Sequence, residues 1–298
     1  MDADTKALSD TLIAEIFFAL GFSKGGFASR VLGWPFRKAT DRLSTIGMTA
    51  DRMIASDGFP AAAAWMMGHW VSRVTVRGAD TITSRGPLLI IANHCGAYDF
   101  LVIPSQLCRP DIKIISSDIP FLKNLPNASD HLFFLTEAAP DRMLAARGAL
   151  RYLRSGGSLL LFGTGLIDPD PAVHPDAEKS IEEWSPSIDL FLRQAPDTQV
   201  VVAICSGIVS RRWAQHPLTH LRRIDWQKRR LAEFGQVLQQ LFVPEKYYVS
   251  PCLSFAPPVS LDELLHESGS NRALPAVVRR GKALLAEHTA WSRTIPKV

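Results

Sequence analysis

The stretch LLIIANHCGAYD, residues 88–99, decides both the fold class and the candidate site. Its first five residues are apolar without interruption and are bounded by Pro87 and Asn93, which predicts a buried strand. A parallel strand that is covered on both faces has such a continuous pattern rather than an alternating one. Chemistry in open α/β sheets collects just past the carboxyl ends of strands. His94 follows this strand and therefore lies where an active site is expected.

His94 and Asp99 form a candidate base and its orienting group. Neutral imidazole takes up a proton near pH 7. A carboxylate bonded to the other ring nitrogen fixes the tautomer and stabilises the imidazolium that forms. The loop between the two residues contains Gly96, which allows the carboxylate to fold back onto the ring. The alternative is a surface loop in which the histidine is unconnected and the aspartate caps the following helix.

Apolar runs and helical patterns alternate along the chain after residue 71, which indicates an α/β sheet. We predict a mixed, largely parallel central sheet flanked by helices. The expected strands are 71–76, 88–92, 111–115, 131–135, 158–162, 199–204 and 247–255. The expected helices in this part are 99–107, a segment from Pro140 to Gly156, 188–192 and 274–288.

Residues 1–75 have mainly helical patterns and no catalytic motif, so we predict an N-terminal helical region ahead of a main domain at 76–298. The simplest interpretation is a helical cap on the main domain. The alternative is a helix pair that rests on a membrane or grips an acyl chain, because Trp and Phe favour interfaces. The aromatic residues that support the alternative are Phe17, Phe18, Trp34, Phe36, Trp65 and Trp70.

The composition is that of a globular protein, with 47% hydrophobic and 21% charged residues among 298. A net charge of +4 does not suggest a nucleic-acid binder. The four cysteines lack close spacing, so we expect reduced thiols and neither a zinc site nor a redox pair. The first residues lack a basic segment ahead of an apolar one, and no apolar run reaches the roughly 20 residues of a membrane span. We therefore expect a soluble or peripherally attached protein.

The block NHCGAYD, together with the apolar strand before it and the FLV after it, resembles the N-H-x-x-x-x-D motif of the glycerolipid acyltransferases, which include the 1-acyl-glycerol-3-phosphate acyltransferases. Weaker similarities follow in the family's order up to about Leu265. They are the blocks KIISSDIPFLKNLP, FGTG, VVVAICSG and LSFAPPVSLDEL. The resemblance implies that His94 and Asp99 are catalytic. It further implies substrate contacts for Asn93, Lys113 and the FGTG turn, which contains Gly163, Thr164 and Gly165.

Two blocks depart from the family pattern where the acceptor is recognised. The family has F-P-E-G-T-R at the position of Phe162 to Ile167, so its glutamate and arginine are missing here. The arginine expected at the end of the second block falls at about Glu137, a reversal of charge, with Arg142 nearby. The changes predict an altered acceptor, such as a head group without a simple phosphomonoester. From the residues alone, the glycine-bearing turn offers N–H groups to a phosphate or an oxyanion, or is an ordinary tight turn.

The resemblance implies an enzyme of phospholipid biosynthesis that moves a fatty acyl group from acyl-CoA or acyl carrier protein to a hydroxyl of a lyso-lipid or glycerol-phosphate-type acceptor. No other cofactor and no metal is expected. The alternatives are a non-catalytic lipid-binding member of the same fold and a lipid hydrolase. Cys95 adjoins His94 in the sequence, but neighbours at a strand end point in different directions and make a poor nucleophile–base pair.

The segment 211–230 carries seven Lys and Arg residues against one Asp, with Trp213 and Trp226. Such a run is usually a solvated helix face. The functional alternative is contact with the phosphates of the acyl carrier or with an anionic membrane, where each basic residue contributes on the order of 1 kcal/mol. We therefore expect a cytoplasmic protein, peripheral to the inner face of the membrane.

Overall fold

The computed structural model describes residues 3–19, 33–136 and 138–296. Its centre is a seven-stranded sheet in the order β1-β7-β6-β2-β5-β3-β4. Neighbouring strands are parallel except β6 and β7, which are antiparallel. The predicted α/β class with a mixed, largely parallel sheet is confirmed. The strands are β1 (Thr75–Arg77), β2 (Leu88–Ala92), β3 (Ile112–Ser117), β4 (Leu132–Leu135), β5 (Ser158–Phe162), β6 (Gln199–Ser206) and β7 (Cys252–Phe255).

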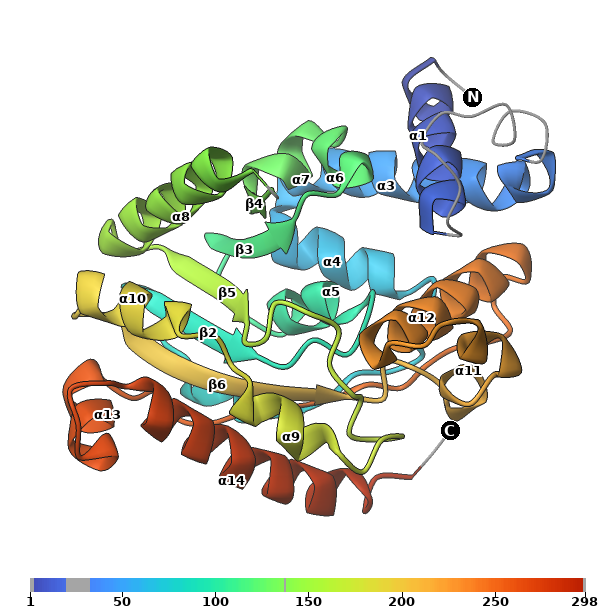
Figure 1. Cartoon of the computed structure of the whole chain (residues 1–298). Helices are drawn as coiled ribbons and strands as arrows, with labels where there is room; N and C mark the ends of the chain where they lie inside the picture. The colour runs from blue at the N-terminus through green and yellow to red at the C-terminus, as the bar shows by residue number, and fades with distance from the viewer. Residues whose placement is uncertain (1–2, 20–32, 137, 297–298) are drawn as a thin grey trace.

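Helices cover both faces of the sheet (Figure 1). One face packs against α3 (Arg37–Asp57), α4 (Phe59–Met67), α5 (Asp99–Ser105) and α12 (Asp225–Phe242). The other packs against α8 (Ala139–Arg154), α9 (Ala177–Glu182), α10 (Ser187–Gln194), α13 (Leu261–Ser268) and α14 (Leu274–Ser292). The remaining α-helices and 3₁₀ turns are α1 (Ala3–Ala19), α6 (Pro120–Lys123), α7 (Pro126–Asp130), α11 (Arg211–Ala214), η1 (Trp34–Phe36), η2 (Ala79–Thr81) and η3 (Pro217–Leu221).

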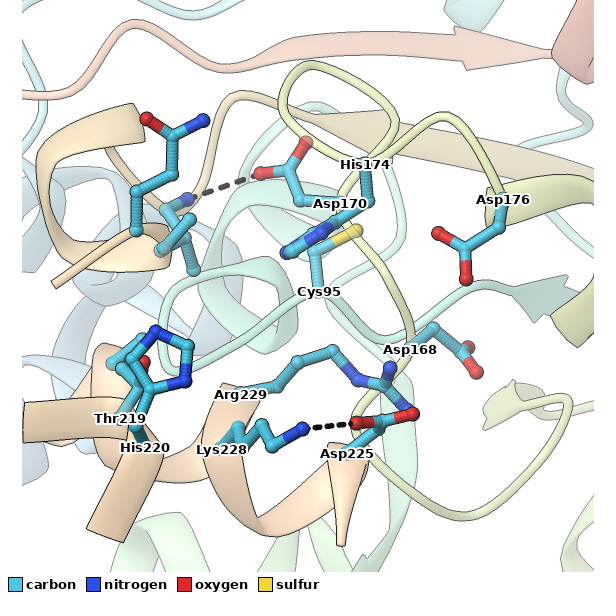
Figure 2. A pocket seen from close by; sticks show the side chains of 14 residues that line it. Cys95, Asp168, Asp170, His174, Asp176, Thr219, His220, Asp225, Lys228 and Arg229 are labelled. Carbon is cyan, nitrogen blue, oxygen red and sulfur yellow. Dashed lines mark hydrogen bonds and ion pairs between the residues drawn. The ribbon is translucent and has the colours of Figure 1, made fainter. Parts of the chain in front are cut away.

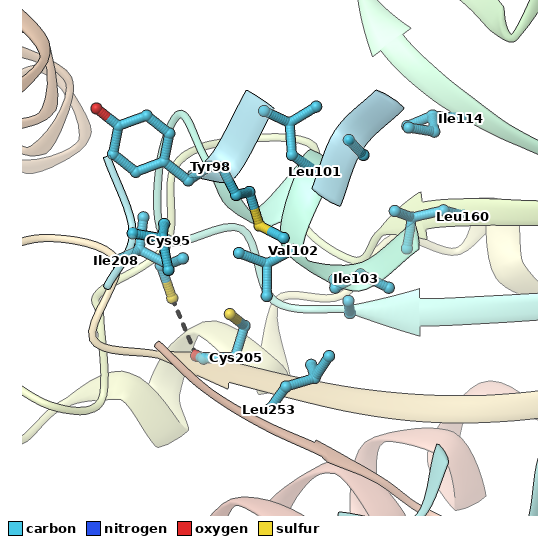
Figure 3. Close-up of a cluster of buried hydrophobic side chains, with 14 of the residues drawn as sticks. Cys95, Tyr98, Leu101, Val102, Ile103, Ile114, Leu160, Cys205, Ile208 and Leu253 are labelled. Carbon is cyan, nitrogen blue, oxygen red and sulfur yellow. Dashed lines mark hydrogen bonds between the residues drawn. The ribbon is translucent and has the colours of Figure 1, made fainter. Parts of the chain in front are cut away.

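The central strand β2 explains the apolar run with which the site begins. Successive side chains of a strand point to opposite faces. Leu88, Ile90 and Ala92 accordingly belong to one hydrophobic cluster, and Leu89 and Ile91 to the other. Figure 3 shows part of the first cluster. Because both faces of β2 are buried, all five of its residues are apolar. His94 lies in the loop that follows the carboxyl end of the strand.

Helices α3 and α4 share this first cluster, whereas the buried side chains of α1 belong to two smaller clusters. Ala39 and Ile46 of α3 and Phe59 and Met67 of α4 are buried in it. The boundary at residue 75 stays a prediction, although β1 begins at Thr75 and pairs with β7. The side chains of Phe17 and Phe18 lie outside the described residues. In the described ranges, no helix combines the length and the hydropathy that a bilayer crossing requires.

Arg109 ties together the starts of the strands that carry the site. Its side chain is 1% exposed and forms a bidentate pair with Asp111, at 2.7 and 2.8 Å. The guanidinium also donates to the carbonyl oxygens of Thr83 and Gly86, at 3.2 and 2.9 Å, just ahead of β2. Asp111 in turn accepts from the N–H of Ser158 at the start of β5, at 3.1 Å. The starts of β2, β3 and β5 are therefore held in fixed positions relative to one another.

We expect Arg109→Leu to lower the free energy of unfolding by about 3 kcal/mol, because the change leaves Asp111 and two carbonyls without their buried partner. Urea unfolding followed by circular dichroism measures the loss. The control is Arg85→Leu at an exposed position of the same loop region, which should change stability by less than about 0.5 kcal/mol. Equal losses in the two variants would show that Arg109 does not anchor the sheet.

Candidate active site

His94 and Asp99 are in direct contact beyond the end of β2. The Nδ1 atom of His94 lies 3.0 and 2.9 Å from the two carboxylate oxygens of Asp99. Asp99, the first residue of α5, is fully buried and also accepts from the N–H groups of Cys95 and Gly96, at 2.6 and 3.1 Å. The carboxylate thus folds the loop back onto the ring. It leaves Nε2 of His94 as the nitrogen free to exchange a proton with a substrate.

The ring of His94 is held from the side by Phe162. The two rings stack with centroids 4.4 Å apart and an interplanar angle of 26°. Phe162 ends β5, and β5 pairs with β2 in a register that sets Ala92 beside Phe162. The His94 side chain remains 25% exposed. An acceptor hydroxyl therefore has access to a ring whose orientation is already fixed.

Asp168 holds the backbone of His94. Its Oδ2 atom accepts from the N–H of His94 at 2.9 Å, and its own N–H donates to the carbonyl oxygen of His94 at 2.6 Å. Its Oδ1 atom accepts from the hydroxyl of Thr164 at 2.8 Å. Burial raises the pKa of Asp168 to about 6, although the hydrogen bonds that its carboxylate accepts from the N–H of His94 and the hydroxyl of Thr164 act to lower it. Thr164 therefore acts on the site through Asp168.

Glu233 of α12 brings another carboxylate to the same loop. A Cβ atom on Gly96 would lie 3.4 Å from Cγ of Glu233, which shows that this side chain lies against the loop of His94. Oε2 of Glu233 is buried and has no hydrogen-bond partner in the described part of the chain. Burial raises the pKa of Glu233 to about 7, with the charge of Asp99 adding to the effect and that of His94 opposing it.

These carboxylates determine the protonation of His94. Burial lowers the pKa of its imidazole, but Asp99, Glu233 and Asp168 outweigh that effect and raise the pKa to about 9. The free protein at neutral pH therefore carries an imidazolium at this position. The ring becomes a competent base as the pH approaches 9 or as a bound group changes the local field.

The side chains of Asn93 and Lys113 are engaged in contacts within the protein, and their substrate contacts stay a prediction. The side chain of Asn93 bridges β2 and β6: its Oδ1 accepts from the N–H of Cys205 at 2.8 Å, and its Nδ2 donates to the carbonyl oxygen of Cys205 at 2.9 Å. Lys113 pairs with Leu159 near the start of its strand, and its ammonium lies over the rings of Phe133 and Tyr152. The structure therefore does not bring Lys113 to His94.

The FGTG turn offers fewer donors than its glycines suggest. The N–H of Gly163 donates to the carbonyl oxygen of Ala92 at 2.8 Å, and that of Gly165 donates to the carbonyl oxygen of Phe162 at 3.1 Å. Within the described residues, the N–H of Thr164 has no such partner, so it is the donor that remains for an oxyanion. A Cβ atom on Gly163 would lie 2.4 Å from Trp184, which explains the glycine by packing. Glu137 of the second block lies outside the described residues.

Cys95 is unsuited to act as a nucleophile. Its thiol is 1% exposed and donates to the carbonyl oxygen of Cys205 at 3.3 Å. Burial raises the pKa of this thiol well above its ordinary value. In the described ranges, no group of three or more His, Cys, Asp or Glu side chains is placed to hold a metal ion.

A cavity of about 400 Å³ lies next to the loop of His94, with Cys95 and Asp168 in its wall (Figure 2). Its other walls come from the 168–176 loop, from residues between 209 and 220, and from the start of α12, which contributes Lys228 and Arg229. Lys228 and Arg229 belong to the basic segment 211–230 that the sequence singled out for contact with phosphates or a membrane. For the 168–176 loop the available signal is the DPD triplet at 168–170, because polar residues in a loop after a buried strand are candidates for a site.

Comparisons with known proteins leave the function to be inferred from the site itself. No protein-family description matches the chain, and no curated protein matches it in sequence. Among solved structures, the chain is similar to the crystal structure of the 1-acyl-sn-glycerophosphate (LPA) acyltransferase, PlsC, from Thermotoga maritima. The two share 14% identity at a TM-score of 0.45, over 99% of this chain and 95% of that one. A likeness of this size assigns no role to any residue.

The imidazole of His94 should titrate near pH 9 in histidine NMR spectra, where its signal is identified by its loss in His94→Gln. Asp99→Asn should lower this pKa markedly, because it removes the main group that favours the cation. Since the folded-state pKa lies above the ordinary 6.5, the imidazolium stabilises the fold fully below pH 6.5, and this contribution is lost as the pH rises through 9. A wild-type pKa at or below 6.5 would contradict the electrostatic description.

Proposed function

We propose that this protein is an O-acyltransferase that moves a fatty acyl group from an acyl thioester, on coenzyme A or acyl carrier protein, to a hydroxyl of a lyso-lipid or glycerol-phosphate-type acceptor. The observation that carries the proposal is the contact between Nδ1 of His94 and the buried carboxylate of Asp99, at 2.9 Å. The contact leaves Nε2 free on a side chain that is partly exposed. This is the arrangement that a general base requires.

The reaction needs a proton acceptor and a hydrogen-bond donor that stabilises the oxyanion. Nε2 of His94 takes the proton of the acceptor hydroxyl as its oxygen attacks the thioester carbonyl carbon. Asp99 stabilises the imidazolium, and the N–H of Thr164 is the candidate donor to the oxyanion. The intermediate collapses, the carbon–sulfur bond breaks, and the thiolate leaves with the proton from His94. The products are the ester and the free thiol of the carrier.

The surface around η3 supports contact with an anionic membrane. Leu218, Leu221 and Ile224 are 50%, 75% and 52% exposed, and Arg211, Arg212 and Arg223 are exposed near them in the chain. Apolar side chains among basic ones suit a membrane interface. Trp213, which the sequence suggested for this role, instead stacks on His216 and donates to Gln239. We propose a peripheral protein at the inner face of the cytoplasmic membrane, with these aliphatic residues inserted.

We expect His94→Ala to lower the rate of acyl transfer by about 10²–10⁴, because the variant lacks the general base. Radiolabelled acyl-CoA and acyl carrier protein are offered with a panel of lyso-lipids, and the acylated lipid is counted. Thermal unfolding checks that the fold is retained. The control is His266→Ala at an exposed position of α13, which should keep full activity.

The same assay separates the alternatives. Free fatty acid without an acylated lipid indicates a hydrolase, and the absence of both products indicates a protein that binds lipid without chemistry. Full activity of His94→Ala would show that the dyad is not the catalytic base.

We expect Leu221→Glu to weaken binding to phosphatidylglycerol vesicles at least about tenfold, because one leucine buried in the membrane contributes roughly 1.5–3 kcal/mol. Co-sedimentation with the vesicles measures the affinity. Leu190→Glu is the matched control, since Leu190 is 55% exposed on α10, across the sheet from η3 and α12. Equal effects of the two substitutions, or equal binding to neutral phosphatidylcholine vesicles, would rule out this surface as the membrane contact.

A further inference from the structure

The cavity beside the dyad has the size of a site for a small polar group. About 400 Å³ is within the usual range for ligand pockets, roughly 300–1,000 Å³. Asp168, which holds the backbone of His94, forms part of its wall (Figure 2). A molecule in this cavity therefore lies beside Asp168, which holds the backbone of His94, while His94 and Asp99 themselves are not among the residues that line it.

Arg229 is the cationic side chain of the cavity that is least engaged, although its charge also acts on Asp168 and Asp225. The ammonium of Lys228 is paired with Asp225 at 2.8 Å. His174 has its pKa lowered, chiefly by burial, and is neutral at pH 7. Arg229 donates from Nε to the carbonyl oxygen of Ile167 at 2.8 Å. Its Nη groups have no hydrogen-bond or ion-pair partner in the described parts of the chain, so they are available to an acidic group.

The carboxylates of the cavity differ in how many hydrogen bonds they already accept. Asp170 accepts from the N–H groups of residues 172, 207, 208 and 209, at 2.8–3.0 Å, and is fully occupied. Asp168 uses one bond on each oxygen and keeps further acceptor capacity toward the cavity. Asp176 is exposed at the cavity wall, and within the described ranges its carboxylate has no partner. Two carboxylates are therefore available to a cation.

We propose that this cavity binds an acceptor head group that carries both charges: Arg229 holds its acidic part, and Asp168 and Asp176 hold its ammonium. The inference rests on the proposed function and specifies its acceptor class. A dianionic phosphomonoester would place two negative charges beside these carboxylates with one free guanidinium to offset them. A phosphodiester monoanion with an attached ammonium is complementary to the cavity, because its negative charge meets Arg229 and its positive charge meets the two carboxylates.

Isothermal titration with two soluble head groups tests the match without requiring catalysis. sn-Glycero-3-phosphoethanolamine carries both charges, and sn-glycerol 3-phosphate carries only negative charge. The wild-type protein should bind the first at least about fivefold more tightly than the second. Arg229→Gln should weaken both, whereas Asp176→Asn should weaken only the first. The matched control, Arg147→Gln, removes an exposed arginine of α8 outside the cavity and should change neither.

Tighter or equal binding of glycerol 3-phosphate would overturn the proposal. Failure of the zwitterion to bind, or binding that neither cavity substitution weakens, would also overturn it.

An acyl-transfer assay distinguishes failure of this proposal from failure of the proposed function. His94-dependent acylation that prefers lysophosphatidic acid to lysophosphatidylethanolamine keeps the acyltransferase and overturns the head-group class. If the titrations give the predicted affinities but no acylated product forms, the head-group site is supported and the acyltransferase function is contradicted. Competitive inhibition by the soluble zwitterion against lysophosphatidylethanolamine is expected if the cavity holds the lipid's own head group.

Discussion

The buried carboxylate of Asp99 is the group on which the geometry of the site depends. It accepts hydrogen bonds from the N–H groups of Cys95 and Gly96 and from the imidazole of His94. A buried carboxylate without partners would cost several kcal/mol. The loop after β2 therefore has a strong reason to fold back, and the ring has one orientation. Phe162 and Asp168 then fix the same histidine from β5 and from the following loop.

Accumulated negative charge is the second constraint on the site. Asp99, Asp168 and Glu233 all favour the imidazolium and raise the pKa of His94 to about 9. A base of this strength is a good proton acceptor, but only about a hundredth of it is free at pH 7. Asp168 also lines the cavity, where in the proposed head-group site it favours an ammonium together with Asp176. Asp168 thus links the protonation of the base to the proposed charge of the acceptor.

Prediction from the sequence succeeded where a local pattern was sufficient. The runs at 88–92 and 158–162 match β2 and β5 to the residue, because strands buried on both faces are almost wholly apolar; the exception is the buried Ser158 that begins β5. The contact of His94 with Asp99 was also predictable, since a short loop joins them. Lys113 shows the limit: its strand was predicted, but its register places it near the start of that strand. Asp168, Arg229 and Glu233 reach the site from distant segments, and the basic composition of 211–230 did not indicate that α12 packs against the loop of His94.

The pH dependence of kcat/KM for acyl transfer tests the central claim most directly. If His94 is a base surrounded by these carboxylates, kcat/KM rises about tenfold per pH unit above neutrality and levels off near pH 9. Asp99→Asn should move the inflection to lower pH while reducing the limiting rate. A profile that is flat or falling between pH 7 and 9, or one that Asp99→Asn leaves in place, would contradict the assignment of His94 as the base.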